Sequence, residues 1–432
     1  RAFAAVGHCV VPSGEDADLV VFNSCTVTHR AAADSRRAIR KLRRKHARAA
    51  LVVTGCYAHL SARAARALGA DLVVGNQKKE ALPQILLEAG LLAPKEPMPT
   101  DVVPMAGASG RTRAFLKVQD GCDNRCAFCI VTLARGRALS RAQRSVIADI
   151  NGLMGLGYRE VVLCGVHLGA YGHDRGDAAG LEKLLASVLV ETDIERLRLS
   201  SLEPWDLHPR FFRLWRNERL LPHLHLPLQS GCNCTLRRMG RSNTRASFRE
   251  LLQAARSAIS DLAVSTDMMV GFPGESAAEF QQSLEFAESM AFARMHIFRY
   301  SRRAGTPAAD MPAQVPASVA KQRSRRMHSL DARMQTQFRR RFVGRKMDVL
   351  WERAQAHGDG VRWSGLTPNY LRVVTDTDDA VNLHNVVTET AMLAAVEEGL
   401  LGEVQPRAAP VESTLGSALQ HPHQMYPQPA GQ

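Results

Sequence analysis

The stretch Cys122-Asp123-Asn124-Arg125-Cys126-Ala127-Phe128-Cys129 places three cysteines in one loop, directly after the strand-like run 115–118. Thiolates at Cys-x3-Cys-x2-Cys spacing can bind three irons of a cubane cluster and leave the fourth iron open to a substrate. A structural zinc site needs a fourth ligand nearby, whereas the next cysteine is Cys164 and the nearest downstream histidine is His167. The odd number of cysteines argues against disulfides. We therefore interpret the loop as a 4Fe–4S site, with zinc or unliganded core cysteines as alternatives.

This loop resembles the cluster loop of radical S-adenosylmethionine (SAM) enzymes. In that family the open iron chelates the amino and carboxylate groups of SAM, and an electron from the cluster splits the sulfonium to give a 5′-deoxyadenosyl radical. The resemblance implies that Cys122, Cys126 and Cys129 are metal ligands and catalytic residues. The spacing identifies the superfamily and leaves the reaction open.

The composition limits the class of protein and of partner. The chain has 432 residues and 45% hydrophobic residues, enough for one to three domains with sizeable cores. Lysine and arginine number 56 against 42 acidic residues, and the net charge of +14 suits a polyanion such as RNA, although a basic background composition is an alternative. Clustered cysteines indicate a reducing, cytoplasmic compartment. No apolar run reaches the ~18 residues of a transmembrane helix, so no membrane partner is expected.

Residues 1–86 predict a small α/β domain. Its apolar strands are predicted over 18–22, 50–54 and 72–74. Strands that alternate with helices are typical of a parallel sheet. Cys25 and Cys56 each follow the carboxyl end of a strand, where open α/β sheets build their sites. Cys9 lies in an extended apolar run and is interpreted as a core side chain.

A strongly basic helix is predicted over 31–49. Its cations are Arg36, Arg37, Arg40, Lys41, Arg43, Arg44, Lys45 and Arg48. So many like charges repel one another unless phosphates or acids lie near. Contact with an RNA backbone and a solvated surface are equally good interpretations.

The middle of the chain predicts a partial parallel (β/α)6 barrel over 108–338, after a linker over 87–107. The linker contains the element-breaking residues Pro94, Pro97, Pro99, Pro104 and Gly107. The barrel strands are predicted over 114–118, 160–164, 197–200, 223–228, 264–270 and 295–300, separated by helices. In such folds the chemistry lies at the carboxyl ends of the strands. The cluster loop follows the first strand, as this rule requires.

Polar or glycine-rich turns end several other strands of this barrel. On one rim they would meet around the open iron and hold the adenosine and methionine parts of SAM. The candidate SAM-binding residues are Gly165, Ser201, Glu203, Gln229 and Asp267. Arg135 or Arg137 could pair with a carboxylate or phosphate, or form an ordinary surface turn. Cys232 and Cys234, with Cys164, fit no common metal spacing and are interpreted as incidental.

Short strand-like runs over 346–352, 370–374 and 385–390 predict a small β-barrel over 341–404. Residues 405–432 are rich in Pro, Gln, His and Ser and predict a disordered tail. His421 and His423 lie in this tail, and tail composition explains them better than metal binding. The fold class is therefore α/β, with a small amino-terminal α/β domain, the partial barrel and a small carboxyl-terminal β-barrel.

Along nearly its whole length up to about residue 404, the chain resembles the radical SAM methylthiotransferases. The motifs that carry the resemblance are Asn23-Ser24-Cys25-Thr26-Val27-Thr28, Val53-Thr54-Gly55-Cys56, 118–129, Ala134-Arg135-Gly136-Arg137, 225–231 and Val270-Gly271-Phe272-Pro273-Gly274-Glu275. Three further stretches, 165–172, 199–204 and 365–370, are most similar to the branch that acts on N6-threonylcarbamoyladenosine in tRNA. Leu133 departs from the family, which usually has proline there.

The resemblance implies a methylthiotransferase domain, a radical SAM core and a tRNA-binding TRAM β-barrel. It also implies a second 4Fe–4S cluster held by three cysteines of the first domain, of which Cys25 and Cys56 match the second and third. The first normally lies in a Gly-Cys loop upstream of Arg1, and the surroundings of Cys9 do not match that motif. We expect either a truncated amino terminus or a weak or absent second cluster.

The function implied is transfer of a methylthio group to C2 of N6-threonylcarbamoyladenosine, the adenosine 3′ of the anticodon. SAM would serve as methyl donor and as radical source. The expected partners are the tRNA anticodon loop, an electron donor of the flavodoxin or ferredoxin type and a sulfur source. The alternatives are methylthiolation of isopentenyl-adenosine in tRNA or of a ribosomal-protein aspartate, and, in another class, a zinc-stabilised RNA-binding protein without catalysis.

Overall fold

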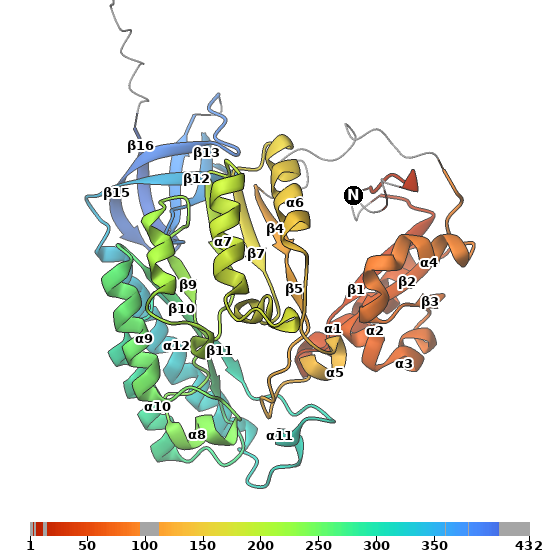
Figure 1. Ribbon diagram of the computed structural model, residues 1–432, viewed down its shortest axis with the longest axis horizontal. Helices are drawn as coiled ribbons and strands as arrows, with labels where there is room; N and C mark the ends of the chain where they lie inside the picture. Colours follow the sequence, from red (N-terminus) through yellow and green to blue (C-terminus); the bar gives the residue numbers. More distant parts are fainter. Residues whose placement is uncertain are drawn as a thin grey trace, which may run out of the picture.

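A computed structural model describes residues 3, 6–11, 15–95, 112–358, 360–378 and 380–405 of the chain. An amino-terminal α/β unit lies beside a central barrel of strands and helices, and a small β-barrel caps the central barrel at one end (Figure 1). The tail from 406 onward, with His421 and His423, lies outside the described residues, as do Pro97, Pro99, Pro104 and Gly107 of the linker. The predictions for these segments stay predictions.

The amino-terminal unit contains a parallel sheet of order β1-β2-β3. Its strands are β1 (Leu19–Ser24), β2 (Ala50–Gly55) and β3 (Leu72–Val73), and its helices are α1 (His29–Lys45), α2 (Cys56–Leu60), α3 (Ala62–Ala67) and α4 (Leu82–Glu88). The central strand β2 is an almost continuous buried apolar run, as expected for a strand covered on both faces. Thr28 caps α1 by accepting a hydrogen bond from the N–H of Ala31.

The prediction that Cys9 is a core side chain is wrong, because its side chain is exposed. Residues 8–11 join no strand, so no neighbouring strand covers them. The imidazole Nε2 of His8 instead lies 2.9 Å from the carbonyl oxygen of Ala93. An apolar run outside a sheet does not by itself bury a side chain.

Six parallel strands build the central barrel, and this confirms the predicted fold class. They are β4 (Arg113–Lys117), β7 (Glu160–Cys164), β8 (Arg196–Leu199), β9 (His223–His225), β10 (Ala263–Val270) and β11 (Arg294–Arg299). They form the three-stranded sheets β4-β7-β8 and β9-β10-β11. Isolated parallel bridges from Leu197 to Leu220 and from Ser201 to His225 link the two sheets. β4 and β11 remain the open edges, so the barrel is partial.

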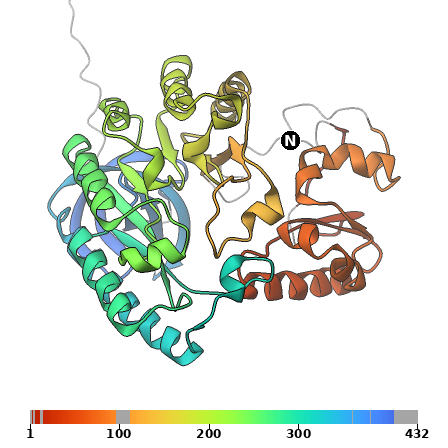
Figure 2. The same ribbon diagram turned by 60° about the horizontal axis from the view of Figure 1, so that its bottom comes forward.

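Helices cover the outside of this barrel (Figure 2). They are α6 (Gln143–Gly155), α7 (Gly180–Glu191), α9 (Arg245–Ala258), α10 (Ala277–Met290) and α12 (Ala317–Arg340). Capping boxes begin α9 at Thr244 and α10 at Ser276. We did not predict α12, because its many cations conceal a helical apolar stripe that includes Met327, Leu330 and Met334.

The carboxyl-terminal strands close into a barrel of order β12-β13-β14-β16-β15. They are β12 (Lys346–His357), β13 (Gly360–Leu366), β14 (Arg372–Thr377), β15 (Val387–Val396) and β16 (Gly399–Val404). We predicted three of these strands. β13 was missed because its glycines are typical of turns, yet Gly365 is needed inside the sheet: a Cβ there would lie 2.6 Å from the carbonyl oxygen of Leu350.

A buried ion cluster attaches this β-barrel to the core. Glu160, at the start of β7, accepts hydrogen bonds from Arg196 at 2.9 Å and from Arg198 at 2.8 Å. Arg196 and Arg198 also donate to the carbonyl oxygens of Leu366 and Pro368 in the β-barrel. Burial disfavours the charge of Glu160, but the two guanidinium groups lower its pKa to about 2.

Among the described residues, no helix is long and apolar enough to cross a lipid bilayer.

Candidate active site

The three-cysteine loop lies at the carboxyl end of β4, between β5 (Gln119–Asp120) and α5 (Val131–Arg135). Gly121 begins it at a φ of +71°, and a Cβ there would lie 1.9 Å from the carbonyl oxygen of Arg137, so no other residue fits. The N–H of Ala127 donates to the carbonyl oxygen of Met239 at 2.8 Å. The backbone therefore holds the loop against the segments that contain Arg137 and Met239.

Each thiol of the loop has a nearby hydrogen-bond donor. The N–H of Asn124 lies 3.4 Å from Sγ of Cys122, and the N–H of Val131 lies 3.5 Å from Sγ of Cys129. An Nη of Arg241 lies 3.9 Å from Sγ of Cys126. Donors of this kind stabilise cluster-bound thiolates and tune the potential of the cluster.

The spacing of these thiols fits a cluster better than a single metal ion. The three sulfur atoms do not all lie within 4.8 Å of one another, which a single small ion would require. Burial raises the pKa of Cys126, and it raises the pKa of Cys129 to about 11, with further contributions from the neighbouring thiols. The positive charge of bound iron would favour the thiolates. The donor set therefore fits a 4Fe–4S cluster bound through Cys122, Cys126 and Cys129.

Arg241 is a site residue that sequence reasoning missed. It donates to both carboxylate oxygens of Glu203, at 3.0 and 2.7 Å, and to the carbonyl oxygen of Pro227 at 2.6 Å. Its guanidinium carbon lies 4.4 Å from the ring centre of Trp205. Burial disfavours its charge, but Glu203 raises its pKa. No pattern around Arg241 signals this role, because its partners come from distant turns.

His167 and Asp206 form a second pair that the sequence did not predict. Nε2 of His167 lies 2.5 Å from the Asp206 carboxylate, and Nδ1 lies 3.8 Å from Sγ of Cys122. Burial favours the neutral ring, but the hydrogen bond with Asp206 raises the pKa of His167 to about 10. The glycine-rich turn after β7 was the available signal, since it holds His167 next to the loop.

The five candidate SAM-binding residues lie toward the carboxyl side of the barrel, and their surroundings differ. Ser201 and Asp267 line a cavity of about 730 Å³. The carboxylate of Glu203 is held by Arg241. Gln229 has a φ of 69°, and its N–H donates to the carbonyl oxygen of Asp267 at 2.8 Å. A Cβ on Gly165 would lie 2.9 Å from Gln119, which marks a close backbone approach.

Cys25 and Cys56 lie side by side at the edge of the amino-terminal sheet. β1 and β2 are parallel, with Ser24 paired to Gly55, so the next residue of each strand is a cysteine. Cys25 is exposed and Cys56 is buried. These positions match the edge at which the sequence placed them.

The helix that follows this edge lies beside α5, the short helix directly after the three-cysteine loop (Figure 1). Helix α2 begins at Cys56 and packs against α5. Arg135, the last residue of α5, donates to Asp120 at 2.9 Å and also interacts with Cys56. Arg303 of the core donates to the hydroxyl of Thr26 at 2.6 Å. These contacts join the cysteine-bearing edge of the amino-terminal unit to the helix that follows the three-cysteine loop.

The two candidate arginines near the loop have carboxylate partners within the chain. Arg135 binds Asp120, as above, and the Arg137 side chain, which is largely exposed, lies 3.6 Å from the Asp123 carboxylate. Arg135 is therefore an internal link between the loop and the amino-terminal unit.

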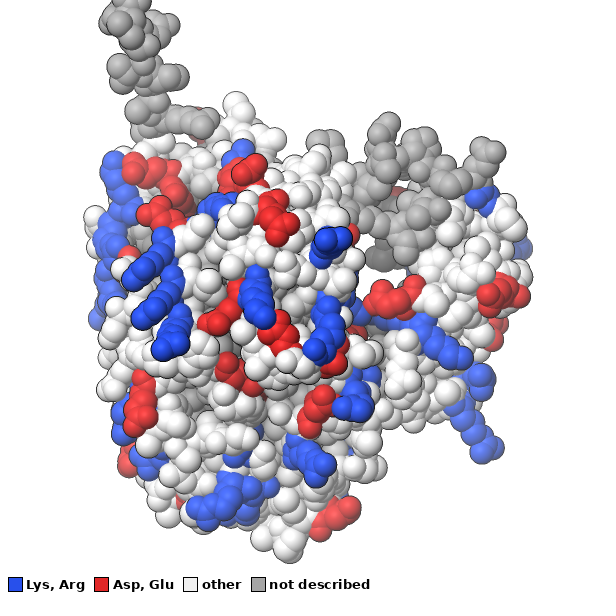
Figure 3. Space-filling model, viewed as in Figure 1, with Lys and Arg blue, Asp and Glu red and all other residues white. Residues whose placement is uncertain are grey.

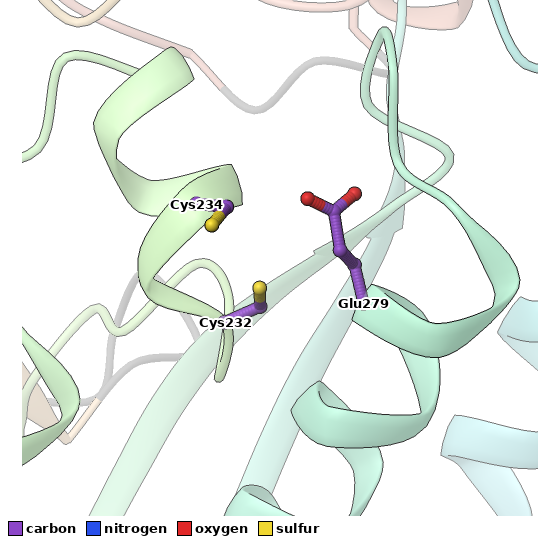
Figure 4. A group of neighbouring side chains, drawn as sticks. All are labelled: Cys232, Cys234 and Glu279. Atoms are coloured by element: carbon purple, nitrogen blue, oxygen red, sulfur yellow. The ribbon is translucent and has the colours of Figure 1, made fainter.

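Cys232, Cys234 and Glu279 are the one group of potential ligands in the described chain with its donor atoms within 4.8 Å of one another (Figure 4). The two cysteines lie at the start of α8 (Asn233–Arg238), and Glu279 lies in the first turn of α10. Both carboxylate oxygens of Glu279 already accept from Arg238, at 2.9 and 2.7 Å. The guanidinium occupies the position of a cation, and the interpretation of these cysteines as incidental stays a prediction.

Cationic and acidic side chains mix on the face shown in Figure 3, with basic side chains gathered along the edge where the β-barrel meets α9. On α1, Arg37, Arg40, Lys41 and Arg44 are exposed. Arg43 instead binds Asp71 at 2.8 Å. The structure leaves both interpretations of this helix, RNA contact and solvated surface, in place.

Comparisons with known proteins identify two families that match separate parts of the chain. Residues 116–287 match the Radical SAM superfamily, and residues 1–75 match a family described as the uncharacterized protein family UPF0004. A search of solved structures finds the radical SAM methyltransferase TsrM from Kitasatospora setae, with a TM-score of 0.52 at 15% identity over 69% of this chain and 67% of that one. At this identity the likeness shows the fold.

Curated relatives cover most of the chain. Threonylcarbamoyladenosine tRNA methylthiotransferase from Bacillus subtilis is 34% identical over 85% of this chain and 84% of its own length. The protein of the same name from Thermotoga maritima is 36% identical over 80% of each chain. A tRNA-2-methylthio-N(6)-dimethylallyladenosine synthase from Novosphingobium aromaticivorans is 36% identical over 84% of each.

Proposed function

This chain belongs to the radical SAM methylthiotransferase family, and we propose that it adds a methylthio group to C2 of N6-threonylcarbamoyladenosine in tRNA. The observation that carries the proposal is the contact between the two cysteine-bearing units: α2, which begins at Cys56, packs against α5, which begins two residues after Cys129. Relatives named for two substrates match at similar identity, so the choice between them rests on the two relatives named for threonylcarbamoyladenosine.

We propose that each predicted domain has a separate role in the reaction. Residues 1–86 would hold a second 4Fe–4S cluster through Cys25, Cys56 and a further ligand. Residues 108–338 are the proposed radical SAM core, joined to the first domain by the linker 87–107. Residues 341–404 would act as a TRAM domain that binds the anticodon arm, because a small closed barrel on a basic chain suits RNA.

The residues present fit the cofactors that the family implies. Cys122, Cys126 and Cys129 would hold the 4Fe–4S cluster, and Gly165, Ser201, Glu203, Gln229 and Asp267 are proposed to position SAM. When bound, cluster and SAM supply the one-electron chemistry that an unactivated C–H bond requires. Arg241 orients Glu203 and places a positive charge near Cys126. His167, held by Asp206 through Nε2, would place its Nδ1 next to Cys122.

The partners of the proposal follow from its chemistry. The adenosine must leave its stack in the anticodon loop to reach the site, as single-stranded RNA allows. A flavodoxin- or ferredoxin-type donor would supply electrons, and a sulfur source would replenish the transferred atom. A cytoplasmic location, where thiols stay reduced, stays part of the proposal.

Nucleoside mass spectrometry of tRNA tests this function. A strain that lacks the chain should lose 2-methylthio-N6-threonylcarbamoyladenosine and accumulate its unmethylthiolated precursor, and the wild-type gene should restore the product. A Cys122→Ala gene serves as the matched control and should not restore it. Loss of the isopentenyl product instead would replace the proposal with its nearest alternative.

A further inference from the structure

The inward side chains of the barrel strands line a cavity of about 730 Å³. This volume lies within the range of about 300–1,000 Å³ that is usual for small-ligand sites. Ser201 and Asp267 line it on the side of the proposed SAM site, and Tyr370 and Arg372 line it on the side of the β-barrel. The cavity therefore connects the reactive end of the core to the proposed RNA-binding unit.

The lining of this cavity is rich in arginine. Its charged residues are Arg113, Arg198, Arg294, Arg339 and Arg372, against Asp267, Glu352 and Glu398. Three arginines are already engaged: Arg113 binds Glu352, Arg198 binds Glu160, and Arg339 donates to backbone carbonyls.

Arg294 and Arg372 differ from the other three. Within the described part of the chain, neither has a carboxylate at ion-pair distance or a side-chain hydrogen bond, and both are exposed to the cavity. Two guanidinium groups without partners favour an anionic ligand, because they can donate paired hydrogen bonds to a carboxylate.

We propose that this cavity recognises the carboxylate of the N6 substituent of the substrate adenosine, with Arg294 and Arg372 as the donors. The inference rests on the proposed function and assigns its specificity. In the register of β10 and β11, Asp267 lies opposite His296. Arg294 lies two residues before His296 along β11, toward the β-barrel. Two strand residues span about 7 Å, which is close to the reach of a threonylcarbamoyl chain.

Two aromatic side chains also border this cavity. Phe115 is 52% exposed and Tyr370 is 36% exposed, although both are large apolar side chains that line the cavity. The Tyr370 ring packs against the His223 ring, with centres 4.6 Å apart, and the Arg198 guanidinium carbon lies 4.4 Å from its centre. A neutral isopentenyl chain would leave the guanidinium groups without a partner, so the cavity discriminates against it.

Binding of synthetic anticodon stem-loop RNA tests the assignment. One RNA carries the threonylcarbamoyl carboxylate, and a second carries its neutral amide. We expect the wild-type protein to bind the carboxylate RNA about ten-fold or more tightly than the amide. Arg294→Gln, Arg372→Gln and the double variant should progressively lose this preference without weakening amide binding. Arg325→Gln, on an exposed face of α12, is the matched control and should keep it.

The outcomes separate this inference from the function beneath it. If the variants lose affinity for both RNAs equally, the arginines contact the RNA backbone and the inference is overturned. A double variant that is folded by circular dichroism and keeps the full preference also overturns it, while the proposed function stands. If the wild-type protein shows no preference and leaves N6-threonylcarbamoyladenosine unmodified, both fail.

Discussion

The two ends of the six-stranded barrel are built on different principles. At the carboxyl end, a short loop holds three thiols through a glycine turn and weak backbone donors. At the other end, fully buried Glu160 binds Arg196 and Arg198, which reach across to the β-barrel. Residues close in the sequence thus supply the three thiols of the reactive end, whereas partners far apart in the sequence hold the other end. The first is visible as a motif, and the second is not.

The largest effect should come from the reactive end. Replacement of Cys126 by alanine removes one of three proposed iron ligands, so reductive cleavage of SAM should fall to background in an anaerobic assay with dithionite. Cys164→Ala, a half-buried thiol outside the loop, is the matched control and should retain cleavage. Equal activity of the two variants would contradict the assignment of the loop.

A second change separates the two groups of cysteines. Cys56→Ala should abolish methylthio transfer, because it removes a proposed ligand of the second cluster, while SAM cleavage continues at the intact loop. The measurement is the ratio of methylthiolated nucleoside to 5′-deoxyadenosine formed. A variant that retains the wild-type ratio would show that Cys56 is not needed for sulfur insertion.

Breaking the ion cluster at the other end should lower stability rather than chemistry. Glu160→Ala leaves Arg196 and Arg198 buried without their carboxylate, which costs about 3–5 kcal/mol of unfolding free energy. Urea unfolding of the two proteins measures the difference. A cost below about 1 kcal/mol would mean that water or the backbone carbonyls replace the carboxylate.

Glu160 should also make the free energy of unfolding depend on pH. The pKa of Glu160 is about 2 in the folded chain against an ordinary value of 4.5, so its ionised form stabilises the fold. This contribution, about 3 kcal/mol, is complete above pH 4.5 and is lost as the pH falls toward 2. The difference in unfolding free energy between wild type and Glu160→Gln should therefore shrink between pH 5 and pH 3. A constant difference would show that the carboxylate has no depressed pKa.

The smallest effect should come from an exposed ion pair between the same two units. Arg345 binds Asp261 through two hydrogen bonds, but both side chains remain partly exposed. Arg345→Gln should cost less than about 1 kcal/mol in the same urea experiment. This variant is also the control for Glu160→Ala, because it shows what loss of an ion pair costs at this interface without burial.

Much of the fold could be predicted from the sequence because its signals are local. The strand over Glu160–Cys164 and the helix over Ala277–Met290 lie where the apolar periodicity predicted them. The thiol loop was recognised from its cysteine spacing, and the rule that sites form at carboxyl ends of parallel strands marked Cys25 and Cys56, like the loop, as candidate site positions. The basic helix α12 and the glycine-containing strand β13 were missed, because burial by tertiary contacts overrides their local composition.

The parts of the site that escaped prediction are those made by distant residues. Arg241, Asp206 and the cavity-lining Arg294 acquire their surroundings only when separate strands meet. A single arginine after a glycine, or at the start of a strand, has no periodicity or spacing to distinguish it from a surface residue. Electrostatic environment is a property of the assembled barrel, and sequence patterns describe only its pieces.

The contact between α2 and α5 sets the distance between the two cysteine-bearing sites. The five-residue helix α2 begins at Cys56, and the five-residue helix α5 begins two residues after Cys129. The gap between the site that would store sulfur and the site that would activate the base is thus fixed by the thickness of packed side chains, not by a covalent tether. A methyl group added or removed in that contact would change the gap, and the yield of transfer per SAM consumed would report the change.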